Sequence, residues 1–125
     1  LYRENVLGEK EIVTEIFLPH APEKSAYVEV KEKQSFDWPL AACTAVYRDK
    51  KWSIILSHVA PVPWRATLAE NMIAGNVDID DNLAEQGADA AIKDAKPMTE
   101  NGFRVQLARA VVRRALLKAV GKEYV

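Results

Sequence analysis

The spacing of apolar residues changes near the middle of the chain, and this change constrains the fold more than any other feature. Before Pro61, apolar residues tend to recur at every second position, which is typical of strands with one buried face. After Pro63 they recur at spacings of three and four residues, which is typical of amphipathic helices. Because strands come first and helices second, the pattern predicts an α+β fold.

Four strand-like segments precede Pro61. The first two span 10–18, where Ile12, Thr14 and Ile16 alternate with charged or larger neighbours, and 25–33. The next two span 40–48 and 52–60 and are joined by a charged turn, which predicts an antiparallel hairpin. We therefore expect an antiparallel sheet of three to four strands.

Three helices are expected after Pro63. The first contains Leu68 and Met72 and ends near Gly75 and Asn76. The second lies in 80–94, and the third, which has the longest apolar face, runs from about 103 to 120. The predicted fold is thus an antiparallel sheet packed against three α-helices, formed by residues 1–125 as a single domain.

The acidic residues before the second helix have two explanations. Asp78, Asp80 and Asn82 have the spacing of the first ligands in a calcium loop, but Leu83 stands where that loop requires glycine. An N-terminal cap at Asp80 or Asp81 explains the pattern better, because a carboxylate there accepts hydrogen bonds from the free amides of the first turn.

Composition excludes several classes of function. With 17 Lys and Arg against 18 Asp and Glu, the formal charge is -1, which does not favour nucleic-acid binding. The apolar runs are far shorter than the ~20 residues that span a bilayer, so we expect a cytoplasmic protein without membrane contact. Cys43 is the only cysteine, so no internal disulfide or thiolate cluster can form. The chain starts at Leu1 rather than Met, and we expect it to be one domain of a longer protein.

Few residues favour catalysis by the chain itself. His20 lies in a Pro-rich turn, and His58 follows an apolar strand, where a hydrogen-bonded structural imidazole is the better interpretation. The last helix is basic and either presents a surface to an anionic partner or simply faces solvent. Its cations are Arg104, Arg109, Arg113, Arg114, Lys118 and Lys122. The loop Phe36-Asp37-Trp38-Pro39 stands out, because a bulky amphipathic ring beside a carboxylate in a loop is costly to leave without a partner. Either Trp38 contacts a binding partner or it folds back over the sheet.

Several segments together resemble one family. They are Glu9–Ile16, Lys33–Ala42, His58–Ala66, Phe103-Arg104 and Val112–Leu116. The chain is similar, from about Gly8 to Gly121, to the C-terminal domain of the FAD-binding subunit of molybdenum hydroxylases. That family includes xanthine dehydrogenases, aldehyde oxidoreductases and aerobic carbon monoxide dehydrogenases.

The resemblance implies a role in electron transfer, without catalysis by the isolated domain. In this family the flavin passes electrons from iron–sulfur clusters to an external acceptor. The preceding domain, absent from this chain, binds most of the FAD, and partner subunits carry the molybdenum cofactor and the 2Fe-2S clusters. The flavin-adjacent loop corresponds here to Lys33, Gln34, Ser35, Phe36, Asp37 and Trp38.

Two positions depart from the family pattern. Glu29 stands where many members have lysine, and a negative charge beside the flavin would disfavour reduced anionic flavin. Ser57-His58 replaces a common glycine pair. An alternative function therefore stays open, in which the same scaffold is a non-catalytic protein-interaction domain that binds a partner through its basic last helix.

Overall fold

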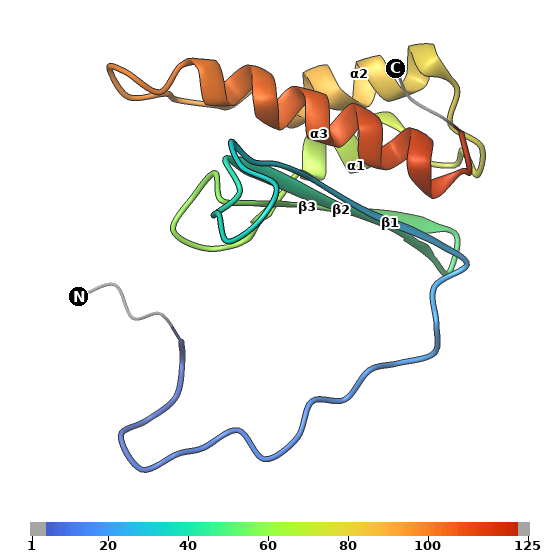
Figure 1. The fold of residues 1–125 in the computed structure, drawn as a ribbon. Helices are drawn as coiled ribbons and strands as arrows, with labels where there is room; N and C mark the ends of the chain where they lie inside the picture. The colour runs from blue at the N-terminus through green and yellow to red at the C-terminus, as the bar shows by residue number, and fades with distance from the viewer. Residues whose placement is uncertain (1–4, 123–125) are drawn as a thin grey trace.

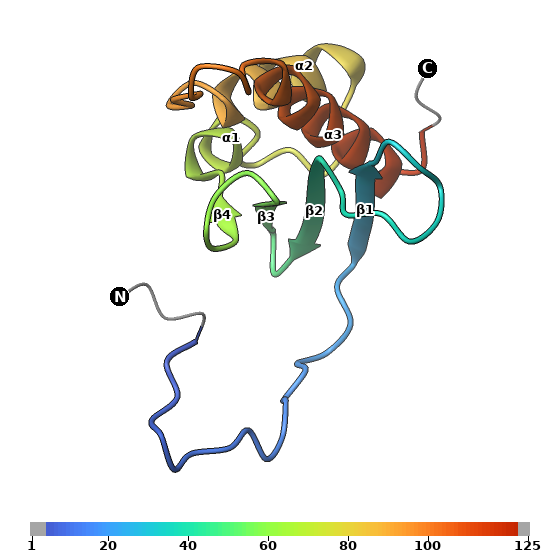
Figure 2. The same ribbon diagram turned by 60° about the vertical axis from the view of Figure 1, so that its left-hand side comes forward.

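The computed structural model describes residues 5–122, and an antiparallel sheet of four strands forms one layer of it. The strands are β1 (Lys24–Val30), β2 (Ala41–Arg48), β3 (Lys51–Ser57) and β4 (Trp64–Arg65), and they lie side by side in chain order. Figure 2 shows this order directly. Cys43 in β2 lies opposite Val28 in β1 and Leu56 in β3. This register places the apolar residues of all three strands on one face.

The helices cover that face of the sheet (Figure 1). They are α1 (Thr67–Met72), α2 (Asp81–Ala91) and α3 (Phe103–Ala119). α3 packs on β1 and β2, and α1 packs on β3. α2 packs on α1 and α3. The buried apolar residues form one core between the sheet and the helices, with Ile54, Ile73, Val111, Val112 and Leu116 all fully buried. The fold class predicted from the sequence is confirmed.

The prediction of a strand over residues 10–18 was wrong. The segment has no strand partner among the described residues, and its large apolar side chains are exposed, including Ile16 at 81% and Phe17 at 87%. An alternating pattern specifies which side chains share a face, but a strand also needs a neighbour for its backbone hydrogen bonds. Figure 1 shows the segment running away from the layers. The fourth strand is instead the short β4.

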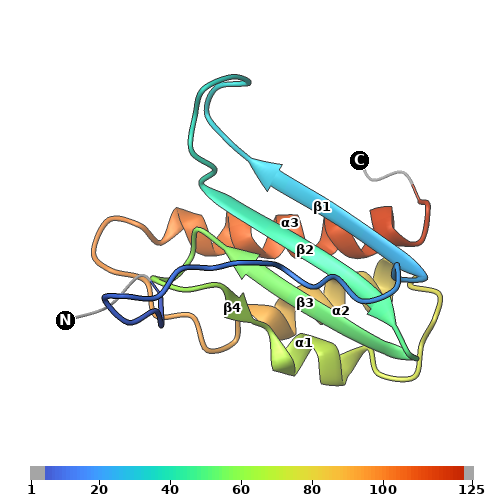
Figure 3. The ribbon, with the colours of Figure 1, turned by 90° about the horizontal axis from the view of Figure 1, so that it is seen from below.

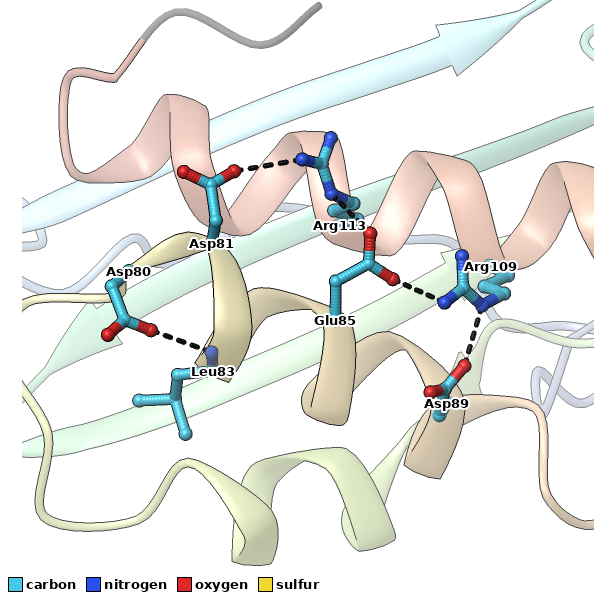
Figure 4. Close-up of polar contacts among 7 residues, drawn as sticks. All are labelled: Asp80, Asp81, Leu83, Glu85, Asp89, Arg109 and Arg113. Carbon is cyan, nitrogen blue, oxygen red and sulfur yellow. Dashed lines mark hydrogen bonds and ion pairs between the residues drawn. The ribbon is translucent and has the colours of Figure 1, made fainter.

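The acidic residue Asp80 caps α2, as predicted. Its Oδ1 accepts a hydrogen bond from the Leu83 amide at 2.7 Å, and its backbone is extended at this position. Figure 4 shows the cap at the start of the helix. The cap satisfies one of the free amides in the first turn, which stabilises a helix by about 1 kcal/mol.

Ion pairs join α2 to α3 along one side (Figure 4). Arg109 pairs with Asp89 at 2.6 Å and also contacts Glu85. Arg113 pairs with Asp81 and with Glu85, each at 2.8 Å. Farther along the basic segment, Lys122 Nζ donates to the Ile79 carbonyl at 2.9 Å. Arg109, Arg113 and Lys122 therefore bind within the domain, so a partner surface and a solvated face are both wrong for these three residues.

The other face of the sheet carries no helix. Figure 3 views the molecule from this side, with the helices behind the strands. Tyr27 and Glu29 alternate with the buried Ala26 and Val28, so they lie on this open face. Within residues 5–122, no helix is long and apolar enough to cross a bilayer.

Candidate functional site

The loop between β1 and β2, residues 31–40, holds two aromatic side chains in solvent. Asp37 Oδ2 accepts a hydrogen bond from the Lys33 amide at 2.9 Å, and the Leu40 amide donates to the Val30 carbonyl at 2.7 Å. Phe36 has a positive φ of 50°, which turns the chain at the tip of the loop. As a result Trp38 is 82% exposed and Phe36 is fully exposed. Figure 2 shows the loop projecting beside β1, in turquoise.

Trp38 lies next to His58, which follows β3. The two ring centroids are 6.3 Å apart and the rings are tilted by 59°. His58 has a positive φ of 64°, so the chain turns sharply at this residue. Together with Asp37 and Arg104, these rings line an open hollow at one end of the sheet. The loop and the start of α3, distant in sequence, meet at this hollow.

Glu29 is part of a small polar chain on the open face of the sheet. Its carboxylate accepts a hydrogen bond from the Tyr27 hydroxyl at 2.8 Å and pairs with Lys31 Nζ at 2.6 Å. The hydrogen bond with Lys31, followed by the one from Tyr27, lowers the pKa of Glu29. Burial and the neighbouring carboxylate raise the pKa of Tyr27. The negative charge that departs from the family pattern is therefore matched by a cation two residues away.

The structure brings together only some of the residues singled out from the sequence. Asp37 and Trp38 both line the hollow, whereas the loop places Lys33 and Gln34 outside its walls. Lys33 contributes its backbone amide to the turn, and Ser35 is exposed. Glu29 lies at the end of β1, near enough to His58 for the imidazole to contribute to its lowered pKa.

Sequence reasoning missed two residues of the hollow. His58 was expected to be a hydrogen-bonded structural imidazole, but it is exposed, has no hydrogen bond to any described residue, and contacts the Trp38 ring. Arg104 was grouped with the other cations of the last helix, although it lies in the first turn of α3. The departure of Ser57-His58 from the family pattern was the one signal that could have directed attention to His58.

The chain offers only part of what a flavin dinucleotide needs. An exposed indole beside a carboxylate suits contact with a planar ring. A pyrophosphate, however, is held by clustered backbone amides, and the glycines are dispersed at Gly8, Gly75, Gly87, Gly102 and Gly121. Among residues 5–122, no group of three His, Cys, Asp or Glu side chains is placed to bind a metal ion. The residues present therefore offer a surface for a planar ring and no cradle for a pyrophosphate.

Residues 27–119 match the family of CO dehydrogenase flavoprotein C-terminal domains. The chain belongs to this family. The match covers the loop, the hollow, all four strands beyond the first residues of β1, and all three helices. The family resemblance noted in the sequence is thereby confirmed.

Solved structures agree with this assignment. Carbon monoxide dehydrogenase from Hydrogenophaga pseudoflava, in a form lacking the Mo-pyranopterin moiety of its cofactor, is 30% identical, with a TM-score of 0.67 over 77% of this chain and 36% of that one. Reconstituted CO dehydrogenase from Oligotropha carboxidovorans is 25% identical, with a TM-score of 0.66 over 80% of this chain and 37% of that one.

A third structure shares the fold. Quinoline 2-oxidoreductase from Pseudomonas putida 86 is 24% identical, with a TM-score of 0.68 over 78% of this chain and 36% of that one. Direct comparison with curated protein sequences gives no significant match. The chain thus spans little more than a third of the length of each of these three solved chains.

Proposed function

We propose that this chain is the C-terminal domain of the FAD-binding subunit of a xanthine dehydrogenase-like molybdenum hydroxylase. In this proposal the loop 31–40 forms a wall beside the flavin, which passes electrons from iron–sulfur clusters to an external acceptor. The domain works in a complex whose partner subunits carry the molybdenum cofactor and the 2Fe-2S clusters. The observation that carries the proposal is the exposed Trp38 in a loop that Asp37 holds in place.

The shape of the loop supports this role. A tryptophan that is 82% exposed leaves a large apolar surface in water, and such a surface gains free energy when a planar partner covers it. The hydrogen bond from the Lys33 amide to Asp37 closes the loop, so Trp38 is displayed with little conformational freedom to lose on binding. A wall of this kind orients the ring and excludes water from one side of it.

Electrostatics adds a second contribution. The pairing of Glu29 with Lys31 leaves that part of the open face close to neutral, so the replacement of the family lysine does not leave an unmatched negative charge. Arg104 lies in the wall of the same hollow and has no carboxylate partner among the described residues. A cation near a flavin stabilises its reduced anionic form, which favours electron transfer to the flavin.

The alternative is a non-catalytic interaction domain on the same scaffold. It relied on the basic last helix as a free surface for an anionic partner. Arg109 and Arg113 instead pair with acidic residues of α2, and Lys118 Nζ donates to the Tyr27 carbonyl at 3.3 Å. Since these cations already have partners inside the domain, the charge of the helix gives the alternative little support.

The proposal is tested on the whole protein that carries this chain. We expect the purified protein to show the visible absorption bands of bound flavin. Trp38→Ala should shift these bands and weaken flavin retention about twofold to tenfold, since an aromatic contact contributes about 0.5–1.5 kcal/mol beyond its buried area. Asp37→Ala should act in the same direction by loosening the loop.

Trp64→Ala is the matched control, because Trp64 is another partly exposed tryptophan, at 48%, but lies on β4, outside the loop and its hollow. A colourless protein would contradict the proposal. Flavin bands that are unchanged in both loop variants would contradict the proposal that the loop forms a wall beside the flavin. The family assignment would stay intact.

A further inference from the structure

A second hollow opens where the end of the sheet meets the connection between α2 and α3. Its cavity volume is about 320 Å³. The walls are mainly apolar and come from three parts of the chain. They include Val59, Trp64, Ala91, Ile92, Pro97 and Val105. Cavities of this size with apolar walls and a few polar groups are typical of small-molecule sites.

Large apolar side chains remain exposed in the walls of this hollow. Trp64 is 48% exposed, Leu68 is 41% exposed, and Val59 is 39% exposed. The three side chains converge on one cavity, unlike scattered surface apolar residues, which need no explanation. A ligand with an apolar body would remove this surface from water at a gain of roughly 25 cal/mol per Å².

Two cations in the walls have no anionic partner among residues 5–122. Arg104 and Lys96 both line the cavity, and neither side chain forms a hydrogen bond or ion pair with a described residue. The guanidinium carbon of Arg104 lies 6.0 Å from the centroid of the Phe103 ring. By contrast, the third cation of the cavity, Arg65, is held by Glu70 at 2.9 Å. The one carboxylate in the lining is Asp94, so unpaired cations outnumber anions by two to one.

We propose that this cavity binds a small amphipathic carboxylate, with its apolar body against Trp64 and its carboxylate at Arg104 and Lys96. A neutral apolar ligand would leave the two cations unpaired. A larger polyanion would be repelled by the Asp94 carboxylate, and the walls hold too few cations to balance its charge. The planar guanidinium of Arg104 suits a carboxylate, with which it forms paired charge-assisted hydrogen bonds. The binding involves no covalent step.

The cavity is distinct from the hollow beneath the loop, although the two share His58, Ala60 and Arg104. The inference does not depend on the proposed flavin role, because Trp64, Lys96 and the α2–α3 connection line this cavity and not the hollow beneath the loop. A protein with no flavin would still be able to bind the carboxylate, so the two proposals can fail separately.

The test is calorimetric titration of the whole protein with 2-naphthoate, with decanoate, and with the neutral 2-naphthylmethanol. We expect one of the two carboxylates to bind at a single site at least tenfold more tightly than the neutral alcohol, since one charge-assisted contact is worth about one factor of ten or more. Preference for naphthoate indicates an aromatic acid as the natural ligand, and preference for decanoate indicates a lipid-derived chain.

Arg104→Gln and Lys96→Gln should each reduce the advantage of the carboxylate over the alcohol by about tenfold. Lys96 is exposed, so Lys96→Gln should leave the fold intact. It therefore still tests the proposal if Arg104→Gln does not fold. Lys93→Gln is the matched control, because Lys93 is an exposed cation three residues away and outside the cavity lining. Equal affinity for acid and alcohol, no saturable binding, or equal effects of Lys93→Gln and Lys96→Gln would overturn the proposal.

Discussion

Glu70 stabilises the edge of the sheet where backbone pairing stops. The Ile54 amide belongs to a fully buried residue of β3, and it donates to Glu70 Oε1 at 2.9 Å. The same carboxylate accepts from Arg65 Nε at 2.9 Å. The side chain of the first helix therefore replaces a strand partner, and this explains how the sheet can end after a β4 of two residues.

Glu70→Ala should lower the free energy of unfolding by about 1–3 kcal/mol, because it leaves the buried Ile54 amide without an acceptor. Glu70→Gln should lower it less, since the amide oxygen can still accept that hydrogen bond. Urea denaturation followed by circular dichroism measures both values. An equal loss in the two variants would show that the charge toward Arg65, and not the acceptor, is what matters.

Gly87 allows α2 to approach its neighbours closely. A Cβ atom built at this position would lie 3.1 Å from Leu116 Cδ1 and 3.2 Å from Ile73 Cγ2. Both neighbours are fully buried, so they have little room to move. The requirement is one of space, because φ at Gly87 lies in the ordinary range for a helix.

Gly87→Ala should destabilise the protein by about 1 kcal/mol. Overpacking in a core costs about 1–3 kcal/mol, and the better helix propensity of alanine offsets about 1 kcal/mol of that. Gly102→Ala is the control, because a Cβ there meets nothing within 4 Å and its backbone is already helical. The control should gain about 0.5 kcal/mol. Thermal unfolding compares the two variants, and stabilisation by both would show that the helices can separate at Gly87.

At the scale of elements, the third helix shows why charge patterns did not predict its partners. The sequence placed Arg109 and Arg113 on a basic helix, but the nearby acids belong to α2, twenty or more residues earlier. Only the packing of α2 against α3 brings Asp81, Glu85 and Asp89 within reach (Figure 4). These pairs are partly exposed, so each contributes modestly to stability.

The N-terminal segment shows that strands also depend on partners elsewhere in the chain. Residues 10–18 alternate as clearly as β1 does, and yet only β1 is paired. Periodicity can be recognised in one segment, whereas a strand forms only when its backbone pairs with a second segment. The prediction was right about β1, β2 and β3, whose partners follow closely in the chain, with ends differing by a few residues.

At the scale of the whole molecule, the burial of Cys43 depends on the folded core, so the ionisation of its thiol is a probe of folding. Cys43 lies in the middle of β2, facing the helices, and is fully buried. Burial raises the pKa of its thiol to about 12. A thiol whose pKa is higher in the folded state is stabilised in its neutral form by folding. The contribution of this thiol to the free energy of unfolding is complete below its pKa in the unfolded state. It is lost as the pH rises through its pKa in the folded state.

The stability of the protein should therefore fall between about pH 9 and about pH 12, relative to a Cys43→Ala variant. The expected difference in slope approaches 1.4 kcal/mol per pH unit, for the one proton released on unfolding. Urea midpoints measured across this range for both proteins provide the comparison. Parallel curves would mean that the thiol is not buried in solution.

The sequence by itself determined the class of the fold, the order of strands before helices, the three helices, a cap at Asp80 or Asp81, and the family. It could do so because periodicity, turns and caps depend on residues that are close in the chain. It also located the loop that contains Asp37 and Trp38, since exposed aromatic residues beside a carboxylate are unusual in a turn.

Only the tertiary structure decided which residues meet. It placed His58 against Trp38, and among the described residues it left Arg104 and Lys96 without ion-pair partners beside an apolar cavity. It also left residues 10–18 without a strand partner within residues 5–122. These outcomes depend on contacts between segments far apart in the chain, or on the absence of such contacts. The spacing of residues along one segment does not encode them, because they arise when the sheet and helices pack around a shared core.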